Sequence, residues 1–398
     1  MVNPRSADLV RKALEEHQLD WKVLISDVGR ALSPAEKKTG QPGVSSRSAP
    51  GTSDSPRYLR YKEVNEFLDD LAKRFPKMVT VKTIGKSSEG RDLRVITISS
   101  SKTLGDDGGD IDPTDVEDKD KQDKQEQDRE GRAKKKNRKG KAKPGIFIDA
   151  GIHAREWIAP ATALYIIHQL VENATHTAKL TNDVDWHILP LMNPDGYEYC
   201  HTTDRLWRKT RSKTWWGLGC AGADANRNFD FHWREVGASW SSCSFTYAGS
   251  KPFSEPESRA VRDYLLANKE QLKMYLTYHS YGNFLLYPWG YTNTLPSDWK
   301  TLDALAKKAN AAMVAAGSEP YTIGSSTNVL YAAAGGSDDW AKGVAGIPLS
   351  YTIELPGGNG HGFDLPASYI PEVGRHQMHL ITVFAKYVGA MKQGQNKE

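Results

Sequence analysis

The 398-residue sequence contains no long run of apolar residues. A helix that crosses a bilayer needs about 18 or more of them in succession, so the sequence predicts no association with a membrane. The first ten residues, MVNPRSADLV, also lack the apolar centre of a secretory signal peptide. We therefore expect neither a membrane anchor nor a leader in the sequence as written.

Charge of either sign is not in large excess. Lys and Arg number 53 and Asp and Glu number 49, which gives a net charge of +4. The basic residues are not gathered on one motif, and much of the excess falls in a single run at 129–143. This distribution argues against a nucleic-acid partner. The 38% of hydrophobic and 26% of charged residues are typical of globular proteins.

Cysteine is scarce, with only Cys200, Cys220 and Cys243 in the chain. Cys220 and Cys243 flank a short polar stretch, and a disulfide between them would stabilise the fold by roughly 3 kcal/mol. Such a bond would imply an oxidising compartment. Three buried thiols are the alternative, and the spacing alone does not separate the two possibilities.

The segment 103–144 has almost no large apolar side chains. It carries twelve acidic residues within 106–130 and nine basic residues within 129–143. A segment of this kind cannot bury enough surface to offset the entropy that it would lose on ordering. We expect a disordered, charged insertion between two strands. A docking or anion-binding arm is the alternative.

The residues before position 57 differ from the rest of the chain. Residues 7–14 show a helical period, and residues 21–25 are typical of a short strand. The stretch 32–56 is rich in Ser, Pro and Gly, and we interpret it as an exposed linker that a protease could cut. Its candidate cleavage sites are Lys37, Lys38 and Arg47.

From 57 to 393 the pattern is that of one large domain in which strands alternate with helices. Strands are predicted at 78–84, 92–99, 146–150, 184–191, 272–278 and 347–354. Helices are predicted at 61–75, 157–173, 256–268, 298–316 and 367–392, with a long loop region up to about 254. The alternation favours an α/β fold with a mixed, largely buried central sheet and helices on both faces.

One short motif carries metal chemistry. The segment 151–157, GIHAREW, follows a buried strand and opens a helix. His153 and Glu156 are three residues apart, so both can point at one spot, and imidazole and carboxylate are good zinc ligands. A catalytic zinc ion usually takes a third ligand, and His279 is the best candidate because it ends the strand at 272–278. Taken alone, such a pair is more often a surface or capping pair.

Further segments follow in an order that resembles the pancreatic A/B-type metallocarboxypeptidases, the funnelin group. The resemblance runs from Tyr58 to Val388, interrupted only by the insertion. It rests on HAREW at 153–157, LWRKTR at 206–211, DANRNF at 224–229, HSY at 279–281, and the stretch 331–340 followed by IEL at 353–355. It implies a zinc-peptidase-like α/β/α sandwich and a zinc enzyme that removes single residues from the C-termini of peptides and proteins.

The resemblance implies a role for each reacting residue. The implied ligands of one zinc ion per chain are His153, Glu156 and His279. Asp224 would accept the ring N–H of His153 and fix its tautomer. Glu354 would take a proton from the attacking water as general base and pass it to the leaving amine. Arg208 would stabilise the oxyanion that develops on the scissile carbonyl.

An enzyme that acts on chain ends must also recognise a free carboxylate. The resemblance implies that Asn226 and Arg227 bind it, and an arginine can meet a carboxylate with two parallel hydrogen bonds. Tyr331 would close over the terminus. The residues implied for the outer subsites are Arg155, Tyr281 and Phe363, with a cis peptide bond between Ser280 and Tyr281.

The residue after a Gly-Gly-Ser turn floors the specificity pocket in this family, and here it is Asp338. B-type relatives carry Asp at this place and release Lys or Arg, whereas A-type relatives carry an apolar residue and take apolar or aromatic ends. A buried carboxylate favours a cation, since an unpaired one is costly. The alternative is that a nearby basic residue already pairs with Asp338. Asp339 adds a second carboxylate beside it.

The resemblance also bears on processing. It implies that 1–31 is the remnant of an activation segment and that Cys220 and Cys243 form a disulfide. A secreted, monomeric zymogen follows from the resemblance, with an activating protease as a possible partner. One departure is that Glu354 is followed by LPGG at 355–358, where the family has an Arg-Asp pair.

Two other functional classes stay open at this point. The first is an inactive relative that binds peptide ends or a partner protein. The second is a zinc hydrolase of the same fold that acts on amide-linked small acids. That enzyme would not need the full set of carboxylate-binding residues.

Overall fold

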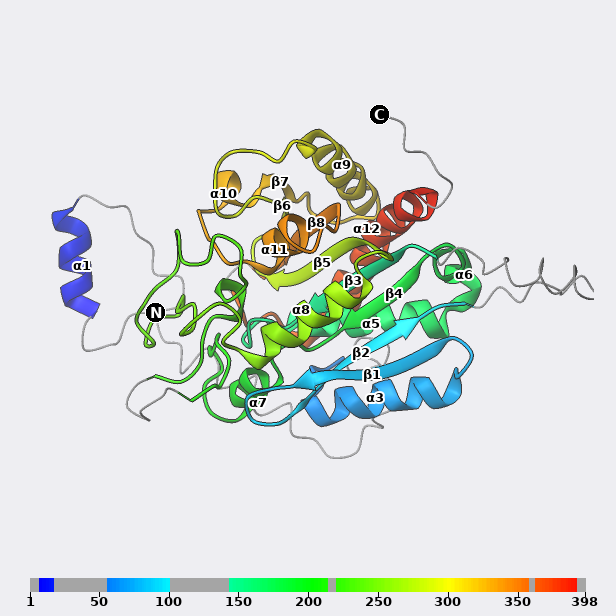
Figure 1. Ribbon diagram of the computed structural model, residues 1–398, viewed down its shortest axis with the longest axis horizontal. Helices are drawn as coiled ribbons and strands as arrows, with labels where there is room; N and C mark the ends of the chain where they lie inside the picture. The colour runs from blue at the N-terminus through cyan, green and yellow to red at the C-terminus, as the bar shows by residue number, and fades with distance from the viewer. Residues whose placement is uncertain (1–6, 18–55, 101–142, 214–219, 358–361, 392–398) are drawn as a thin grey trace, which may run out of the picture.

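The computed structural model describes most of the chain (Figure 1). The described residues are 7–17, 56–100, 143–213, 220–357 and 362–391. The strand expected at 21–25 lies outside them, as do nearly all of the linker and of the insertion at 103–144. The helix expected at 7–14 is confirmed as α1 (Ala7–Glu16).

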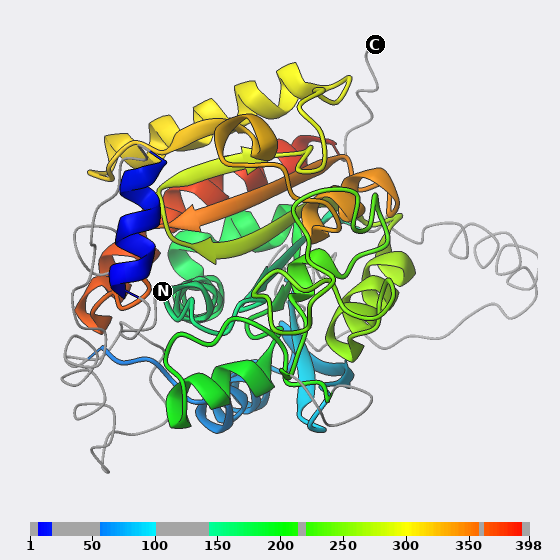
Figure 2. The ribbon, with the colours of Figure 1, turned by 90° about the vertical axis from the view of Figure 1, so that its left-hand side faces the viewer.

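An eight-stranded mixed sheet forms the centre of the fold, in the order β1-β2-β4-β3-β5-β8-β6-β7. Its strands are β1 (Val79–Lys86), β2 (Asp92–Ile98), β3 (Gly145–Ala150), β4 (Asp185–Leu189), β5 (Leu272–Ser280), β6 (Phe284–Tyr287), β7 (Thr322–Ser325) and β8 (Leu349–Leu355). The four central strands β4, β3, β5 and β8 are parallel, and β2 and β6 pair with them in antiparallel fashion. Figure 2 shows the twist of the sheet, because β1 and β2 run steeply across the direction of β5 and β8.

Helices cover both faces of the sheet, as the alternation predicts. They are α3 (Tyr61–Arg74), α5 (Ile158–Glu172), α6 (Ala174–Asp183), α7 (Pro194–Thr202), α8 (Pro256–Asn268), α9 (Trp299–Ala315), α10 (Ser326–Val329), α11 (Ser337–Gly343) and α12 (Ile370–Met391). The larger core joins one face of the sheet to α3, α5, α9 and α12, and a second core joins the other face to α8 and α11 (Figure 1). All six residues of β3 are buried, as expected for a parallel strand covered on both sides.

The strands and long helices predicted from the sequence are confirmed with small shifts at their ends. The prediction missed β6, β7, α6, α7, α10 and α11. Its loop region up to about 254 was wrong over α7, which begins at Pro194 after the capping residue Asn193. The Asn193 side chain accepts a hydrogen bond from the Gly196 amide at 2.9 Å and so caps the start of the helix. The sequence therefore contained the capping residue, but no clear helical period of apolar residues follows it.

Both ends of the insertion attach at the edge of the sheet where β2 ends and β3 begins. The Lys143 ammonium donates to the Ser100 carbonyl at 2.8 Å and to the Thr181 carbonyl at 3.0 Å. It also lies 3.0 Å from the Asp185 carboxylate. The carboxyl ends of β3, β5 and β8 point to the opposite edge, where ligands gather in α/β folds.

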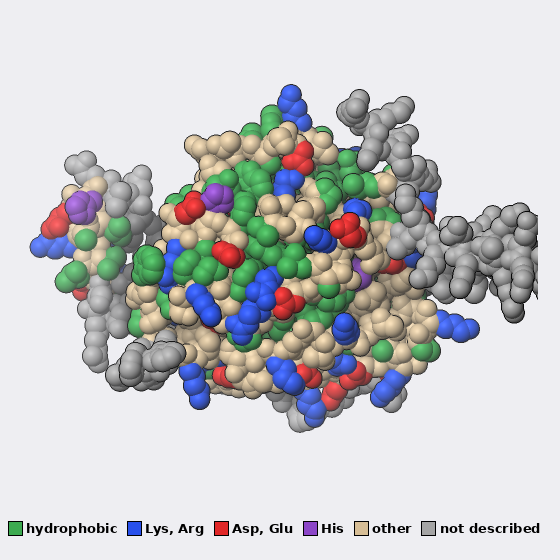
Figure 3. Space-filling view, viewed as in Figure 1, with side chains coloured by type: hydrophobic (Ala, Val, Ile, Leu, Met, Phe, Trp, Pro, Cys, Tyr) green, Lys and Arg blue, Asp and Glu red, His purple; other side chains and the backbone are tan. Residues whose placement is uncertain are grey.

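On the face shown in Figure 3, basic and acidic side chains of the described residues are interspersed. Among the described residues, no helix combines the length and the apolarity that a membrane crossing requires.

Candidate functional site

Three side chains predicted as metal ligands converge at the carboxyl edge of the sheet. His153 lies in the turn after β3, Glu156 stands two residues before the start of α5, and His279 lies near the end of β5. The His153 Nδ1 atom is 2.8 Å from Glu156 Oε1, and the His279 Nδ1 atom is 3.1 Å from both His153 Nδ1 and Glu156 Oε2. All three residues are buried, and their ligand atoms lie within 4.8 Å of one another.

The other ring nitrogen of each histidine has an acceptor. His153 Nε2 lies 3.2 Å from Asp224 Oδ1 and His279 Nε2 lies 3.1 Å from the Thr277 hydroxyl. The Thr277 hydroxyl donates to Asp149 Oδ1 at 2.7 Å, so it accepts from His279. With a metal ion at the shared point, each ring would keep its proton on Nε2 and offer its Nδ1 lone pair to the metal. Two such nitrogens and a carboxylate suit a zinc ion.

Asp224 links this cluster to Arg208. Its Oδ2 atom accepts from Arg208 Nε at 3.1 Å and from Nη2 at 2.9 Å, while Oδ1 faces His153. Burial disfavours the charged form of Asp224, but Arg208 and His153 outweigh it and hold the pKa well below its usual range. Arg208 Nη1 also lies 3.9 Å from Glu156 Oε1, which places a fixed cation at the rim of the cluster.

Glu354 lies on β8 directly beside His279, its register partner on β5. Burial raises the pKa of Glu354 to about 7, against the opposing charges of His279 and Arg208. Glu156 behaves differently: burial opposes its ionisation too, but the two imidazoles outweigh it and lower its pKa. Glu354 therefore binds a proton more readily than its neighbour Glu156 does.

A pocket opens beside Glu354. Its lining residues are Asn226, Arg227, Leu286, Gly290, Ser326, Leu330, Tyr331, Ala333, Gly336, Asp338, Thr352 and Glu354. Asn226 Oδ1 accepts from the Ser337 amide at 2.9 Å, and Arg227 Nε donates to the Gly237 carbonyl at 3.0 Å. These bonds fix both side chains at the wall of the pocket. Tyr331 is 59% exposed, as expected for a residue at the mouth.

Asp338 lies inside this pocket and is only 7% exposed. Its Oδ2 atom accepts from the Thr352 hydroxyl at 3.0 Å. Within the described part of the chain, no Lys, Arg or His forms an ion pair with Asp338, so the structure does not contain the internal basic partner considered above. The pocket thus offers a carboxylate without a protein cation.

Asp339 faces elsewhere. Its carboxylate accepts from the Gly290 amide at 2.9 Å and from the Tyr291 amide at 3.1 Å. Burial and the charge of Asp338 raise the pKa of Asp339 well above its usual range. Asp339 therefore holds the segment around Gly290 in place, and it is not one of the residues that line the pocket.

The residues expected at the outer subsites lie together. The Arg155 guanidinium lies 4.1 Å from the centre of the Phe363 ring, and Phe363 meets Tyr281 edge to face at 4.9 Å. The expected cis peptide bond between Ser280 and Tyr281 is present. Phe245 could not be recognised from the sequence; the centre of its ring lies 5.6 Å from the Arg155 guanidinium, and the residue is 45% exposed.

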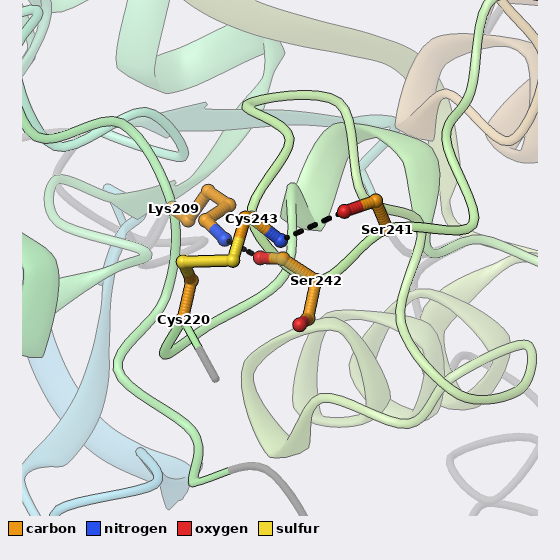
Figure 4. The surroundings of a disulfide bond; sticks show 5 residues. All are labelled: Lys209, Cys220, Ser241, Ser242 and Cys243. Carbon is orange, nitrogen blue, oxygen red and sulfur yellow. Dashed lines mark hydrogen bonds between the residues drawn. A yellow bond between two sulfur atoms is a disulfide. The ribbon is translucent and has the colours of Figure 1, made fainter. Parts of the chain in front are cut away.

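The disulfide between Cys220 and Cys243 is present, and Cys200 is a buried free thiol (Figure 4). Beside the bond, Lys209 Nζ donates to the Ser242 carbonyl at 2.5 Å. The bond ties the segment leading to Asp224 to the loop that precedes Tyr247, whose carbonyl accepts from the Asp224 amide at 2.7 Å. It thereby supports the residue that links the metal cluster to Arg208.

Comparisons with known proteins give a consistent result. The family model described as zinc carboxypeptidase matches residues 64–379. Carboxypeptidase B of Astacus astacus is 45% identical over 331 residues, which cover 83% of this chain and 97% of that protein. Carboxypeptidase B of Rattus norvegicus is 35% identical over 383 residues, with 95% and 80% covered. The crystal structure of carboxypeptidase A from Helicoverpa armigera matches with a TM-score of 0.81 at 30% identity, over 98% of this chain and 88% of that one.

The hydroxyl of Thr277 gives a test of the metal cluster. Replacing Thr277 with Val removes the acceptor for His279 Nε2 while keeping the side-chain shape, so we expect zinc affinity to fall by about 10- to 100-fold. Chelator competition measures this affinity without reference to activity. Thr162→Val is the matched control, since Thr162 is fully buried and its hydroxyl has no hydrogen-bond partner among the described residues. Equal zinc affinities for the two variants would contradict the assigned role.

Proposed function

The chain belongs to the zinc carboxypeptidase family, and from this premise we propose that it is a metallocarboxypeptidase specialised for C-terminal Lys or Arg. Zinc-dependent hydrolysis of peptides is the activity of the family. The specificity rests on one observation. Asp338 is a buried carboxylate inside the substrate pocket, and no basic residue of the described chain pairs with it.

His153, Glu156 and His279 would hold the zinc ion, since their ligand atoms meet at one buried point and the other nitrogen of each ring has an acceptor. When bound there, zinc would lower the pKa of a water molecule to about 7 and polarise the scissile carbonyl. The Asp224 and Thr277 acceptors raise the basicity of the two imidazoles and keep them in position.

Glu354 would move the proton. It lies next to His279 across the parallel strands β5 and β8, at the wall of the pocket. A carboxylate there can accept a proton from the attacking water and return it to the leaving amine. Arg208 would stabilise the negative charge that develops on the carbonyl oxygen, because Asp224 already holds its guanidinium in place and little reorganisation is needed.

Asn226, Arg227 and Tyr331 would bind the terminal carboxylate at the mouth and wall of the same pocket. The side chain of the terminal residue would then reach Asp338 in the interior. A Lys or Arg side chain would satisfy the buried carboxylate, whereas an apolar one would leave it unpaired. This favours the B-type preference over the A-type preference.

The two other functional classes are less well supported. An inactive relative would have no reason to keep Glu354, Arg208 and three convergent ligands in working geometry. A hydrolase of amide-linked small acids would not need Asn226 and Arg227 to be fixed by the bonds to Ser337 and Gly237. Arg155, Tyr281 and Phe363 also suit a peptide that extends beyond the scissile bond.

Processing and location are part of the proposal. Residues 1–31 would belong to an activation segment and 32–56 to a linker open to an activating protease, followed by the catalytic domain at 57–393. The disulfide between Cys220 and Cys243 supports an oxidising, extracellular location. We propose that the protein acts as a monomer, because all the proposed site residues come from one chain. The insertion at 103–144 attaches at the edge of the sheet opposite the pocket, which suits a segment that projects away from the substrate.

The specificity can be tested with hippuryl-Arg and hippuryl-Phe. We expect the wild type to prefer the Arg substrate. Asp338→Asn should lower kcat/KM for hippuryl-Arg by about 100-fold or more, because it removes one partner of a buried ion pair. Asp338→Ile should shift the preference further towards Phe. Asp298→Asn is the control, as Asp298 pairs with Lys342 at 2.8 Å outside the pocket. An unchanged Arg-to-Phe ratio in the Asp338 variants would show that the pocket is wrongly assigned.

The role of Glu354 can be tested with Glu354→Gln. We expect kcat to fall by about 10²- to 10⁴-fold, while zinc content and peptide binding stay as in the wild type. Glu257→Gln is the matched control: Glu257 is also buried, burial raises its pKa to about 7, and it bonds the Ser88 amide at 2.9 Å instead of facing the pocket. Substantial turnover by the Glu354 variant would rule out Glu354 as the base.

A further inference from the structure

Asn173 begins the one Asn-X-Ser/Thr triplet in the sequence, which is Asn173-Ala174-Thr175. A triplet of this kind is the acceptor signal for N-linked carbohydrate in chains that pass through a secretory compartment. Neither the metal cluster nor the substrate pocket uses these residues. Short triplets also occur by chance, so the surroundings of Asn173 in the fold decide whether it suits a glycan.

Asn173 lies at the junction of two helices. It follows the last residue of α5 and precedes the first residue of α6. Its φ of −104° and ψ of 37° leave the helical region, so the chain turns at this residue. The residue is also partly exposed. A turn at the surface is a setting that accommodates a bulky group on a side chain without disturbing the core.

The hydrogen bonds of Asn173 are compatible with a modified amide nitrogen. Its backbone carbonyl accepts from the Thr177 amide at 3.2 Å, whereas its side chain makes no capping bond to α6. The side-chain Nδ2 atom donates to Gln169 Oε1 at 2.9 Å. An amide nitrogen carries two hydrogens, so attaching a sugar leaves one for Gln169. The start of α6 therefore depends on the backbone of Asn173 and not on the nitrogen that would be modified.

The junction lies at the edge of the sheet opposite the proposed active site. Helix α5 begins two residues after Glu156 and has 15 residues, so its ends are about 22 Å apart at about 1.5 Å per residue. Near the other end of α6, the Thr181 carbonyl accepts from Lys143, just before the start of β3. Figure 1 shows α6 at this edge, away from the arrowhead of β5. A glycan on Asn173 would therefore project far from the pocket.

We propose that Asn173 is an N-glycosylation site, modified when the chain enters the secretory compartment. The inference rests on the proposed extracellular location, which the disulfide between Cys220 and Cys243 supports. The donor is a lipid-linked oligosaccharyl diphosphate. The bond from the anomeric carbon of its first sugar to the diphosphate oxygen breaks, and a bond from that carbon to Asn173 Nδ2 forms. Nδ2 loses one proton, and the lipid diphosphate leaves.

The test uses the full chain, secreted from cultured eukaryotic cells behind an added secretion leader and then digested with a peptide N-glycosidase. We expect the digestion to remove a single glycan from the wild type and to convert Asn173 to an aspartate, which peptide mass spectrometry detects. Hydrolysis of hippuryl-Arg should be the same before and after digestion, because the glycan lies far from the pocket.

Two variants at Thr175 form a matched pair. Thr175→Ser keeps the hydroxyl that the acceptor signal requires and should retain the glycan, whereas Thr175→Val lacks it and should lose the glycan. Asn173→Gln should lose the glycan as well. All three variants should hydrolyse hippuryl-Arg as the wild type does.

A wild-type chain that is secreted with its disulfide formed but without carbohydrate on Asn173 would overturn the proposal. So would a Thr175→Val protein that keeps its glycan, or a loss of hippuryl-Arg hydrolysis when the glycan is removed. Failure of the glycosylated wild type to hydrolyse hippuryl-Arg would instead contradict the proposed function, since mass spectrometry reports on Asn173 independently of activity.

Discussion

The parallel pairing of β3, β5 and β8 is the constraint on which the rest of the site depends. Because the three strands run the same way, their carboxyl ends meet at one edge of the sheet. His153 follows β3, His279 lies near the end of β5, and Glu354 stands beside it on β8. A slip of one residue in the β5–β8 register would turn Glu354 to the opposite face, since side chains alternate along a strand.

Around that edge of the sheet, the buried carboxyl groups differ in their partners. Asp224 is shared between His153 and Arg208, which keeps it ionised although it is fully buried. Asp339 is fixed by backbone amides instead, and burial raises its pKa. Asp338 differs from both in its surroundings, because it is a buried carboxylate that lines the pocket. The proposed roles of these carboxyl groups therefore follow from their partners. Asp224 and Asp339 support the structure of the site, whereas Asp338 is available to the substrate.

Much of this arrangement could be predicted from the sequence, because the signals were local. The alternation of strands and helices indicated the layered fold, and the HAREW segment placed two ligands after a buried strand. The resemblance then assigned residues far apart in the chain, and the structure brings His153, Glu156 and His279 together. Phe245 and Thr277 could not be recognised in this way. Their importance comes from contacts with distant residues, and nothing in their own neighbourhood marks them.

The secondary structure shows the same limit. Helix α7 carries a capping residue and a Pro at its start, but its nine residues have no long apolar period, so its packing against the rest of the fold decides the helix. Strands β6 and β7 have four residues each and are stabilised by their neighbours in the sheet. Asp149 could have been recognised from the sequence, because it is a charged residue within an otherwise apolar strand. In the structure it supports His279 through Thr277.

The central claim is that two imidazoles and one carboxylate from His153, Glu156 and His279 share a single zinc ion. X-ray absorption spectroscopy at the zinc edge, on the zinc-loaded protein, tests it most directly. The account predicts one zinc ion per chain, with two imidazole nitrogens at about 2.0–2.1 Å, further oxygen ligands at about 2.0–2.2 Å and no sulfur ligand. A sulfur ligand at about 2.3 Å, or a spectrum with fewer than two imidazoles, would contradict it.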